Sequence, residues 1–309
     1  MARRFYNKLG VLTKIETTEG TDAAPTGAAN AIQMSNASIT PLAGDQASRN
    51  LLLPYLGQQG IVLTGTYAQI KGDVEIAGAG AAGDVPGYGV LLRACGMAET
   101  ITAGTDVKYA PISADFESAS IYYNADGVNH ILLGSRGTWT LDLTPKQIPH
   151  FTFTLSGLLG TILDTALPTV DLAAFQTPVP VSKANTTLSL HGWAAVAESL
   201  SLDLGNQVSP RFLIGDESVP ISNRSASGTA VVEARTIATI DWFGKAKSAT
   251  RGALAAQHGT VAGNIVKIDA PAVQIGRPTQ GQTDGVLNYS LPLLVCPDAG
   301  DDELVITVK

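Results

Sequence analysis

Strict alternation of polar and apolar residues is the feature that most constrains the fold of this 309-residue chain. Three stretches alternate without interruption, namely residues 138–143, 151–156 and 199–204. Successive side chains of a strand point to opposite faces, so each of these runs has one apolar face and one polar face. Such runs are typical of antiparallel strands that cover a core on one side only. The alternation therefore predicts a mainly β protein.

Several further ranges have the β-branched and aromatic content of strands. They are residues 32–39, 61–76, 117–123, 230–236, 265–275, 287–294 and 304–308. Asp126-Gly127 and Asp284-Gly285 predict tight turns between strands. Helices are predicted over residues 88–97 and 241–258, the second because it is rich in helix-forming residues.

Two parts of the chain resemble each other and predict an internal duplication. Residues 38–53 and 199–214 share an alternating run, a glycine, a Gln-x-Ser and an arginine before an apolar triplet. The matching positions are Gly44 with Gly205, Gln46 with Gln207, Ser48 with Ser209, Arg49 with Arg211 and Glu75 with Glu233. We predict an N-terminal arm (1–30), a first repeat (31–162), a Pro-, Ala- and Thr-rich linker (163–187) and a second repeat (188–309). The two Asp-Gly turns fit the same offset, but a match between the closing strands 151–156 and 287–294 would break it, so both stay unassigned.

Composition argues against several functional classes. The net charge of −7 does not suit a protein that grips nucleic acid phosphates, although it suits an acidic surface past which DNA slides. No apolar run approaches the roughly 18 residues of a membrane span. Cys95 and Cys296 cannot form a disulfide framework, and we interpret each as a small buried hydrophobe. With only 15% charged residues, the chain suits a protein that buries much of its surface against copies of itself.

One short motif imitates a dinucleotide-binding site. Gly78, Gly80 and Gly83 have the spacing G-x-G-x-x-G after a strand-like run. In a true site the third glycine opens a helix, but Pro86 and Gly87 prevent a helix from continuing out of Gly83. We interpret the segment as a linker of small residues.

No group of residues supports catalysis. His130, His150, His191 and His258 are scattered without the spacing of metal ligands. The acidic segment 297–304 is compatible with calcium, but it lacks an EF-hand loop and reads as a solvated turn. We therefore expect no enzyme activity, no catalytic or cofactor-binding residue and no metal site.

Two long hairpins predict a surface for partners. The first runs from Ile39 to Ile70 and carries the apolar loop 51–56 between polar and glycine-rich flanks. The second repeat has a matching segment, 211–220, which is apolar first and polar afterwards. Exposed apolar loops of this size usually contact a partner.

Residues 118–157 resemble the major tail tube protein of long-tailed, non-contractile (siphovirus) phages. The likeness is carried by the Asp126-Gly127 turn, the Gly-Ser-Arg-Gly segment 134–137 and the aromatic strand that ends at Ser156-Gly157. The stretch 289–306 is similar to the end of two-domain members. The second repeat lacks the Gly-Ser-Arg-Gly segment.

The resemblance implies a structural virion protein that self-assembles into stacked rings, which form the tail tube and conduct DNA during ejection. The implied fold is mainly β, with two tandem tail-tube-like antiparallel sandwich or half-barrel repeats, each with one flanking α-helix. Each repeat contributes a curved sheet to an inner β-barrel. Single-domain members form hexamers, so a fused pair implies trimers arranged as a pseudo-hexameric ring, with true hexamers as the alternative.

The resemblance also implies partners and a location. The partners are other copies of the chain, the tape measure protein, the tail terminator and the distal tail protein, while DNA passes through the lumen without specific binding. The location is the virion tail, with the host cytoplasm during assembly. We expect ring-to-ring contacts from the hairpins 39–66 and 204–224, and further contacts from the arm 1–30, ordered on assembly. The candidate interface residues are Asp45, Arg49, Leu52, Tyr55, Leu56, Asn206, Arg211, Phe212 and Asp216.

Two other structural or binding functions remain open. A phage capsid or decoration protein would form closed shells in place of tubes. A two-domain carbohydrate-binding β-sandwich would expose clustered aromatic residues, whereas the three tryptophans here are spread along the chain.

Overall fold

Antiparallel strands dominate the computed structural model, which describes residues 3–309 and is 51% strand and 5% helix. The mainly β prediction is confirmed. The strands of the N-terminal half are β1 (Leu9–Ile15), β2 (Ala31–Ile32), β3 (Ser35–Ser48), β4 (Ile61–Glu75), β5 (Met97–Thr102), β6 (Asp106–Pro111), β7 (Ala119–Ala125), β8 (Val128–Leu143), β9 (His150–Leu159) and β10 (Leu163–Asp164). Those of the C-terminal half are β11 (Thr186–Leu190), β12 (Trp193–Ala194), β13 (Ala197–Asp203), β14 (Asn206–Val208), β15 (Arg211–Leu213), β16 (Asp216–Ser218), β17 (Ile221–Arg224), β18 (Ser227–Glu233), β19 (Arg251–His258), β20 (Val266–Ile275), β21 (Thr279–Thr283), β22 (Val286–Cys296) and β23 (Val305–Val308). The helices are α1 (Gly27–Asn30), α2 (Gly89–Ala94) and α3 (Trp242–Lys247). Within residues 3–309 none of these helices has the length and apolar character to cross a bilayer.

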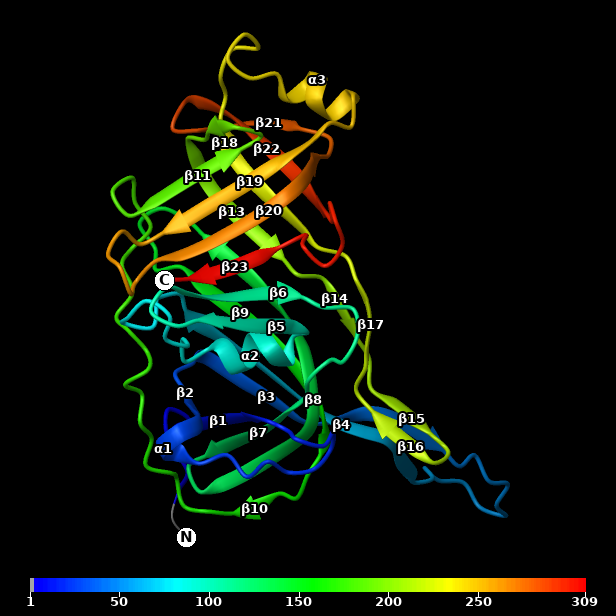
Figure 1. Cartoon of the computed structure of the whole chain (residues 1–309). Coiled ribbons are helices and arrows are strands. Elements are labelled where there is room, and N and C mark those ends of the chain that lie inside the picture. The colour runs from blue at the N-terminus through cyan, green and yellow to red at the C-terminus, as the bar shows by residue number, and fades with distance from the viewer. Residues whose placement is uncertain (1–2) are drawn as a thin grey trace.

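One curved sheet, which we call the wall sheet, extends through both halves of the molecule (Figure 1). Its strands lie side by side in the order β3, β4, β9, β8, β13, β18 and β22, and every pairing is antiparallel. The first four strands come from the predicted first repeat and the last three from the second. The pairing of β8 with β13 therefore makes one continuous surface from two parts of the chain.

A second layer of strands packs over the wall sheet. In the N-terminal half, β1 pairs with β7 and β7 pairs with β8. In the C-terminal half, β11 pairs with β19 and β19 pairs with β20. Strand β23 pairs with both β20 and β6, so the end of the chain also joins the two halves.

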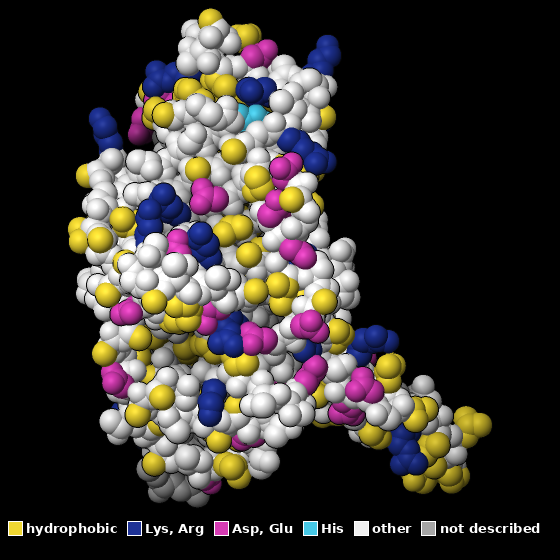
Figure 2. All heavy atoms as spheres, in the orientation of Figure 1, with side chains coloured by type: hydrophobic (Ala, Val, Ile, Leu, Met, Phe, Trp, Pro, Cys, Tyr) yellow, Lys and Arg dark blue, Asp and Glu magenta, His cyan; other side chains and the backbone are white. Residues whose placement is uncertain are grey.

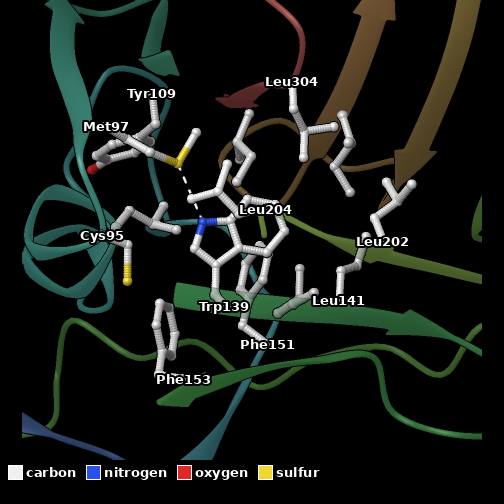
Figure 3. Packing of buried hydrophobic residues seen from close by; sticks show 14 of the residues in the cluster. Cys95, Met97, Tyr109, Trp139, Leu141, Phe151, Phe153, Leu202, Leu204 and Leu304 are labelled. Carbon is white, nitrogen blue, oxygen red and sulfur yellow. Dashed lines mark hydrogen bonds between the residues drawn. The ribbon is translucent and has the colours of Figure 1, made fainter. Parts of the chain in front are cut away.

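The two halves share one hydrophobic core. Trp139 of β8 is fully buried, contacts Phe151 edge to face with ring centroids 5.2 Å apart, and donates a hydrogen bond to Met97 Sδ at 3.3 Å. Leu202 and Leu204, from the other half, lie beside Trp139 and are also buried (Figure 3). Buried apolar residues of both halves belong to the same cluster. Burial of this shared surface makes the folding of either half depend on the other.

The predicted helix over 241–258 is wrong beyond its first turns. Helix α3 ends at Lys247, and the alanine-rich remainder forms β19. Leu254, Ala256 and His258 alternate inward along β19, which pairs with β11 on one edge and β20 on the other. Pairing on both edges outweighs the helix propensity of these residues. The helix predicted over 88–97 is confirmed in type as the shorter α2.

The predicted N-terminal arm is corrected for residues 9–20, because they belong to the body of the fold. Strand β1 is paired with β7 along its whole length. Immediately after β1, the buried carboxylate of Glu16 accepts four hydrogen bonds of 2.7–2.9 Å. These bonds offset the free-energy cost of burying its charge. The donors are the amides of Gly20 and Gly134 and the hydroxyls of Ser118 and Ser120. The first two residues of the predicted arm lie outside the described residues.

The segment 163–187 lies along the first half instead of hanging free between the halves. Strand β10 pairs with β8, and the Asp171 amide donates to Gly27 O at 3.0 Å. The ring of Phe175 lies so close to Gly87 that a Cβ there would come within 2.5 Å of it. Val181 is buried, and its amide donates to Gln147 O at 2.9 Å. The segment therefore adds packing to the first half.

The closing strands have the same pairing in both halves. Strand β9 lies on β4 with His150 opposite Glu75, and β22 lies on β18 with Asn288 opposite Glu233. The two Asp-Gly turns differ, because one joins β7 to β8 and the other joins β21 to β22. The strand pairing supports the proposed duplication and assigns the closing strands, not the turns, as its matching parts.

Candidate assembly surfaces

The face of the wall sheet that points away from the core is polar. Directly opposed residues of antiparallel strands share a face, so the registers define rows across the sheet. One row contains Glu75, His150, Asp142, Ser201 and Thr229, and the next contains Asp73, Thr152, Thr140, Asp203 and Ser227. These side chains are partly or fully exposed, whereas residues between them, such as Phe151 and Leu141, are buried. A single polar surface thus spans both halves.

Carboxylates outnumber ammonium groups among the described residues of this polar face. It carries the acids Asp73, Glu75, Asp142, Asp203 and Glu233 and the base Lys71, and Arg235 forms an ion pair with Glu233 at 3.2 Å. Asp73 accepts hydrogen bonds from Asn36 Nδ2 at 2.8 Å and from Thr152 Oγ1 at 2.6 Å. An excess of fixed negative charge repels phosphate groups.

A projecting arm extends from the lower part of the body (Figure 1). It consists of the distal β3–β4 hairpin, residues 44–65, and the β15–β16 hairpin, residues 211–218. The two predicted hairpins, far apart in sequence, therefore lie side by side. The end of the arm is rich in apolar side chains (Figure 2). Leu52 and Leu56 are as exposed as in an extended chain, at 102% each, and Ile214 reaches 109%.

Two glycines let the hairpins of the arm approach each other. Gly65 has φ +56°, and a Cβ there would lie 2.9 Å from the ring of Phe212. Gly44, at φ +136°, sits where the β3–β4 register shifts, and a Cβ there would lie 2.7 Å from Gly65 O. Glycine adopts positive φ without steric cost, so the backbone kinks here and Phe212 covers it.

The structure places eight of the nine candidate interface residues on the arm. Asp45 and Arg49 are exposed at the end of β3, and Leu52, Tyr55 and Leu56 lie in the apolar loop. Arg211, Phe212 and Asp216 belong to the β15–β16 hairpin. Phe212 serves mainly to hold the two hairpins together, which the sequence did not indicate.

Asn206 lies inside the molecule, away from the end of the arm. Its side chain is buried, and Nδ2 donates to Cys95 O at 2.6 Å and to Gly137 O at 2.9 Å. These hydrogen bonds join β14 of the second half to carbonyls of the first half. Asn206 stabilises the contact between the halves, and we leave it out of the assembly surface.

Arg136, in the segment that carries the family resemblance, connects the arm to the body. It is 7% exposed and donates to both carboxylate oxygens of Glu19 at 2.7 and 2.8 Å. It also donates to the carbonyls of Phe116, Glu117 and Val219, the last of which lies between β16 and β17. Sequence reasoning assigned Arg136 no role, although an arginine within a run of small residues was the available signal.

The acidic segment 297–304 is organised by hydrogen bonds and an ion pair. Asp302 accepts from the amides of Asp298 and Ala299, both at 2.9 Å, and these bonds lower its pKa. Glu303 is buried beside Arg224, so the prediction of a fully solvated turn is wrong for this residue. Among residues 3–309 no group of three or more His, Cys, Asp or Glu has the arrangement of a metal site.

The glycine motif and two of the histidines have structural roles. The Gly78 amide donates to Asn264 Oδ1 at 2.7 Å and the Gly80 amide to Gly263 O at 2.8 Å, so this loop contacts the second half. Helix α2 begins only at Gly89, as the interpretation of the motif as a linker requires. His191 and His258 hydrogen-bond backbone carbonyls, and burial lowers the pKa of both.

Comparison with known families identifies a match over nearly the whole chain. A family profile described as phage tail tube protein matches residues 7–292, which include both halves of the wall sheet and the arm. No curated protein matches the chain. The family resemblance inferred from residues 118–157 is confirmed by this match.

Proposed function

The chain belongs to the phage tail tube protein family, and we propose that three copies of it close each ring of the tube. Its role is structural, and it assembles with itself into the tube of the phage tail. The observation that supports three copies is the continuous wall sheet, because one chain supplies two equivalent wall segments joined by β8 and β13. Six segments, the number implied by hexameric relatives, then require three chains.

We propose that the polar face of the wall sheet lines the lumen. Its half-exposed threonines, serines and carboxylates form no site for bases, and its negative charge keeps DNA phosphate in solution rather than on the wall. DNA then passes during ejection without specific binding. The apolar face meets the second layer and is unavailable to the lumen.

The projecting arm is the proposed contact between stacked rings. Its end exposes Leu52, Leu56 and Ile214 to solvent, and apolar groups of this kind gain free energy when a partner covers them. Asp45, Arg49, Arg211 and Asp216 give the sides of the arm charges that can set its orientation. The tape measure, terminator and distal tail proteins are further proposed partners, through family membership alone.

Negative-stain electron microscopy of the concentrated, purified protein tests this function. Hollow tubes with a regular axial repeat are expected, and averages viewed down the axis should have three subunits per ring with pseudo-sixfold features. True sixfold rings of separate chains would contradict the trimer. Closed shells would favour a capsid protein, and glycan binding by a monomer would favour a carbohydrate-binding sandwich.

A further inference from the structure

A junction between two wall segments already exists inside the chain. Strand β8 of the first half pairs antiparallel with β13 of the second. The opposed residues are Leu143 with Leu200, Asp142 with Ser201, Leu141 with Leu202 and Thr140 with Asp203. The leucines face the core and are buried, and the other residues lie on the polar face. This junction defines how one wall segment adds to the next.

Strand β21 extends the wall sheet beyond β22, and the sheet then has a free edge at each end within the described residues. Strand β3 pairs only with β4, and β21 pairs only with β22. All five residues of β21, Thr-Gln-Gly-Gln-Thr, are exposed, and none is charged or a proline. Edge strands of proteins that stay monomeric usually carry charges, prolines or bulges that block pairing. An unprotected β21 is therefore suited to receive another strand.

The free edge of β21 is equivalent to the edge of β8 that receives β13. In the first half, Asp142 of β8 lies opposite His150, which lies opposite Glu75. In the second half, Gly281 of β21 lies opposite Asn288, which lies opposite Glu233. Counting from the matching glutamates, Gly281 takes the place of Asp142, and Thr279 takes the place of Thr140.

The free edge of β3 is equivalent to the edge of β13 that binds β8. Ser38 and Thr40 of β3 lie opposite Lys71 and Gln69, and Ser201 and Asp203 of β13 lie opposite Thr229 and Ser227. Lys71 precedes Glu75 by the same number of residues as Thr229 precedes the matching Glu233, so Lys71 corresponds to Thr229. Ser38 therefore takes the place of Ser201, and Thr40 takes the place of Asp203.

We propose that β21 of one copy pairs antiparallel with β3 of the next copy, with Thr279 opposite Thr40 and Gly281 opposite Ser38. This inference rests on the proposed ring and names the strands and register of its joint. The contact is head to tail, since β21 and β3 are different surfaces, and such contacts form closed rings when the rotation closes. Pairing satisfies free backbone groups of β21 and of the Ser38–Thr40 part of β3. Pro41, the next residue of β3, has no N–H and takes the place of Leu204, whose amide donates to Trp139 O within the chain, so this one bond is absent from the joint between copies.

The joint between copies is built to be weaker than the junction within the chain. The positions of the buried Leu141 and Leu143 are occupied in β21 by Gln280 and Gln282. Glutamine gains much less than leucine from burial, so the joint depends mainly on backbone pairing. Free copies are therefore expected to remain monomeric at low concentration. They add more readily to a ring that has already formed or to an end template.

Disulfide cross-linking tests the strands and the register together. All variants carry Cys296→Ser, since Cys296 is partly exposed, whereas Cys95 is buried. Opposed residues in antiparallel strands have Cα atoms about 4.5–5.5 Å apart, which a disulfide can bridge. Thr40→Cys and Thr279→Cys proteins are expected to cross-link when mixed and not separately. The chain with both substitutions should give covalent trimers on a non-reducing gel.

Two matched controls make the result specific. Thr140→Cys with Asp203→Cys places the same pair at the junction within the chain and should close an intramolecular disulfide. Ser38→Cys with Thr279→Cys shifts the register by two residues, to a Cα separation of about 7–8 Å, and should cross-link at least tenfold more slowly. Equal rates for the two intermolecular pairs would overturn the register.

A second variant keeps the test decisive if the purified chain remains monomeric. Gln280→Leu with Gln282→Leu is expected to lower the concentration for ring formation at least tenfold, with the Thr40 to Thr279 cross-link retained. Monomers without this cross-link in both backgrounds would overturn the joint. Tubes seen by microscopy without the cross-link would overturn the joint and leave the tail tube role intact. Cross-linked rings that never stack would support the joint and contradict the stacking role of the arm.

Discussion

Removing the two most exposed leucines of the arm is the strongest test of its proposed role in ring stacking. Leu52 and Leu56 are each 102% exposed, so they contribute no packing to the folded chain. Covering a fully exposed leucine is worth about 1.5–3 kcal/mol. The double substitution Leu52→Ser and Leu56→Ser should therefore weaken stacking by at most about 3–6 kcal/mol per chain. At about 1.4 kcal/mol per factor of ten, this corresponds to a roughly 10²- to 10⁴-fold higher concentration for tube formation.

The measurement is the concentration above which tubes sediment and appear by electron microscopy. The thermal unfolding midpoint of the unassembled variant should stay within about 1 °C of the parent, because surface substitutions of this kind change stability little. Gln58→Ser is the matched control, since it removes an exposed polar side chain from the same loop and should shift the assembly concentration less than twofold. An unchanged assembly concentration for the double variant would refute the reasoning, and so would a large loss of folding stability.

Three further predictions concern the fold that supports these surfaces. Gly65→Ala places a Cβ against the ring of Phe212 at a residue with positive φ, so the contact between the two hairpins should loosen. Amide hydrogen exchange in residues 211–218 should then accelerate. Adding Phe212→Ala should remove the part of this effect that comes from the steric clash. Leu202→Ala should lower the free energy of unfolding by about 2–5 kcal/mol, because it leaves a cavity in the core. Calorimetry should still show a single unfolding transition, since both halves share this core, and two separate transitions would contradict the prediction. Burial lowers the pKa of His258 below the unfolded value of about 6.5, so its contribution to stability is complete above that pH and is lost as pH falls below it. The unfolding midpoint should fall between pH 7 and 5, with a smaller fall for His258→Gln; identical slopes would exclude this histidine as a cause.

Much of the wall sheet could be predicted from the sequence. The alternating runs in β8, β9 and β13 predicted strands with one buried face, and Trp139, Phe151 and Leu202 are buried there. Such a pattern is readable because each side chain's direction follows from local backbone geometry alone. The same pattern predicted the polar face, although not that its rows continue across both halves.

The register with which β8 of the first half pairs with β13 of the second could not be predicted. The paired residues are some sixty positions apart, and no local pattern signals their contact. The same limit applies to β19. Its alanines favour a helix locally, and only two flanking strands make the extended form more stable. Glu16 and Arg136 are similar cases, since their hydrogen-bond partners come from other strands and loops.

The candidate surface follows the same division. The apolar loop 51–56 was recognisable because leucines flanked by polar and glycine residues have no core to join. That the β15–β16 hairpin lies against the β3–β4 hairpin depends on the contact of Phe212 with Gly65 of β4. Asn206 points inward because its amide donates to Cys95 O and Gly137 O, which belong to the other half. The sequence by itself determined which residues alternate, and so the strands and their polar and apolar faces. Tertiary structure alone decided which edges meet, because strand pairing is made by backbone groups that every residue type shares.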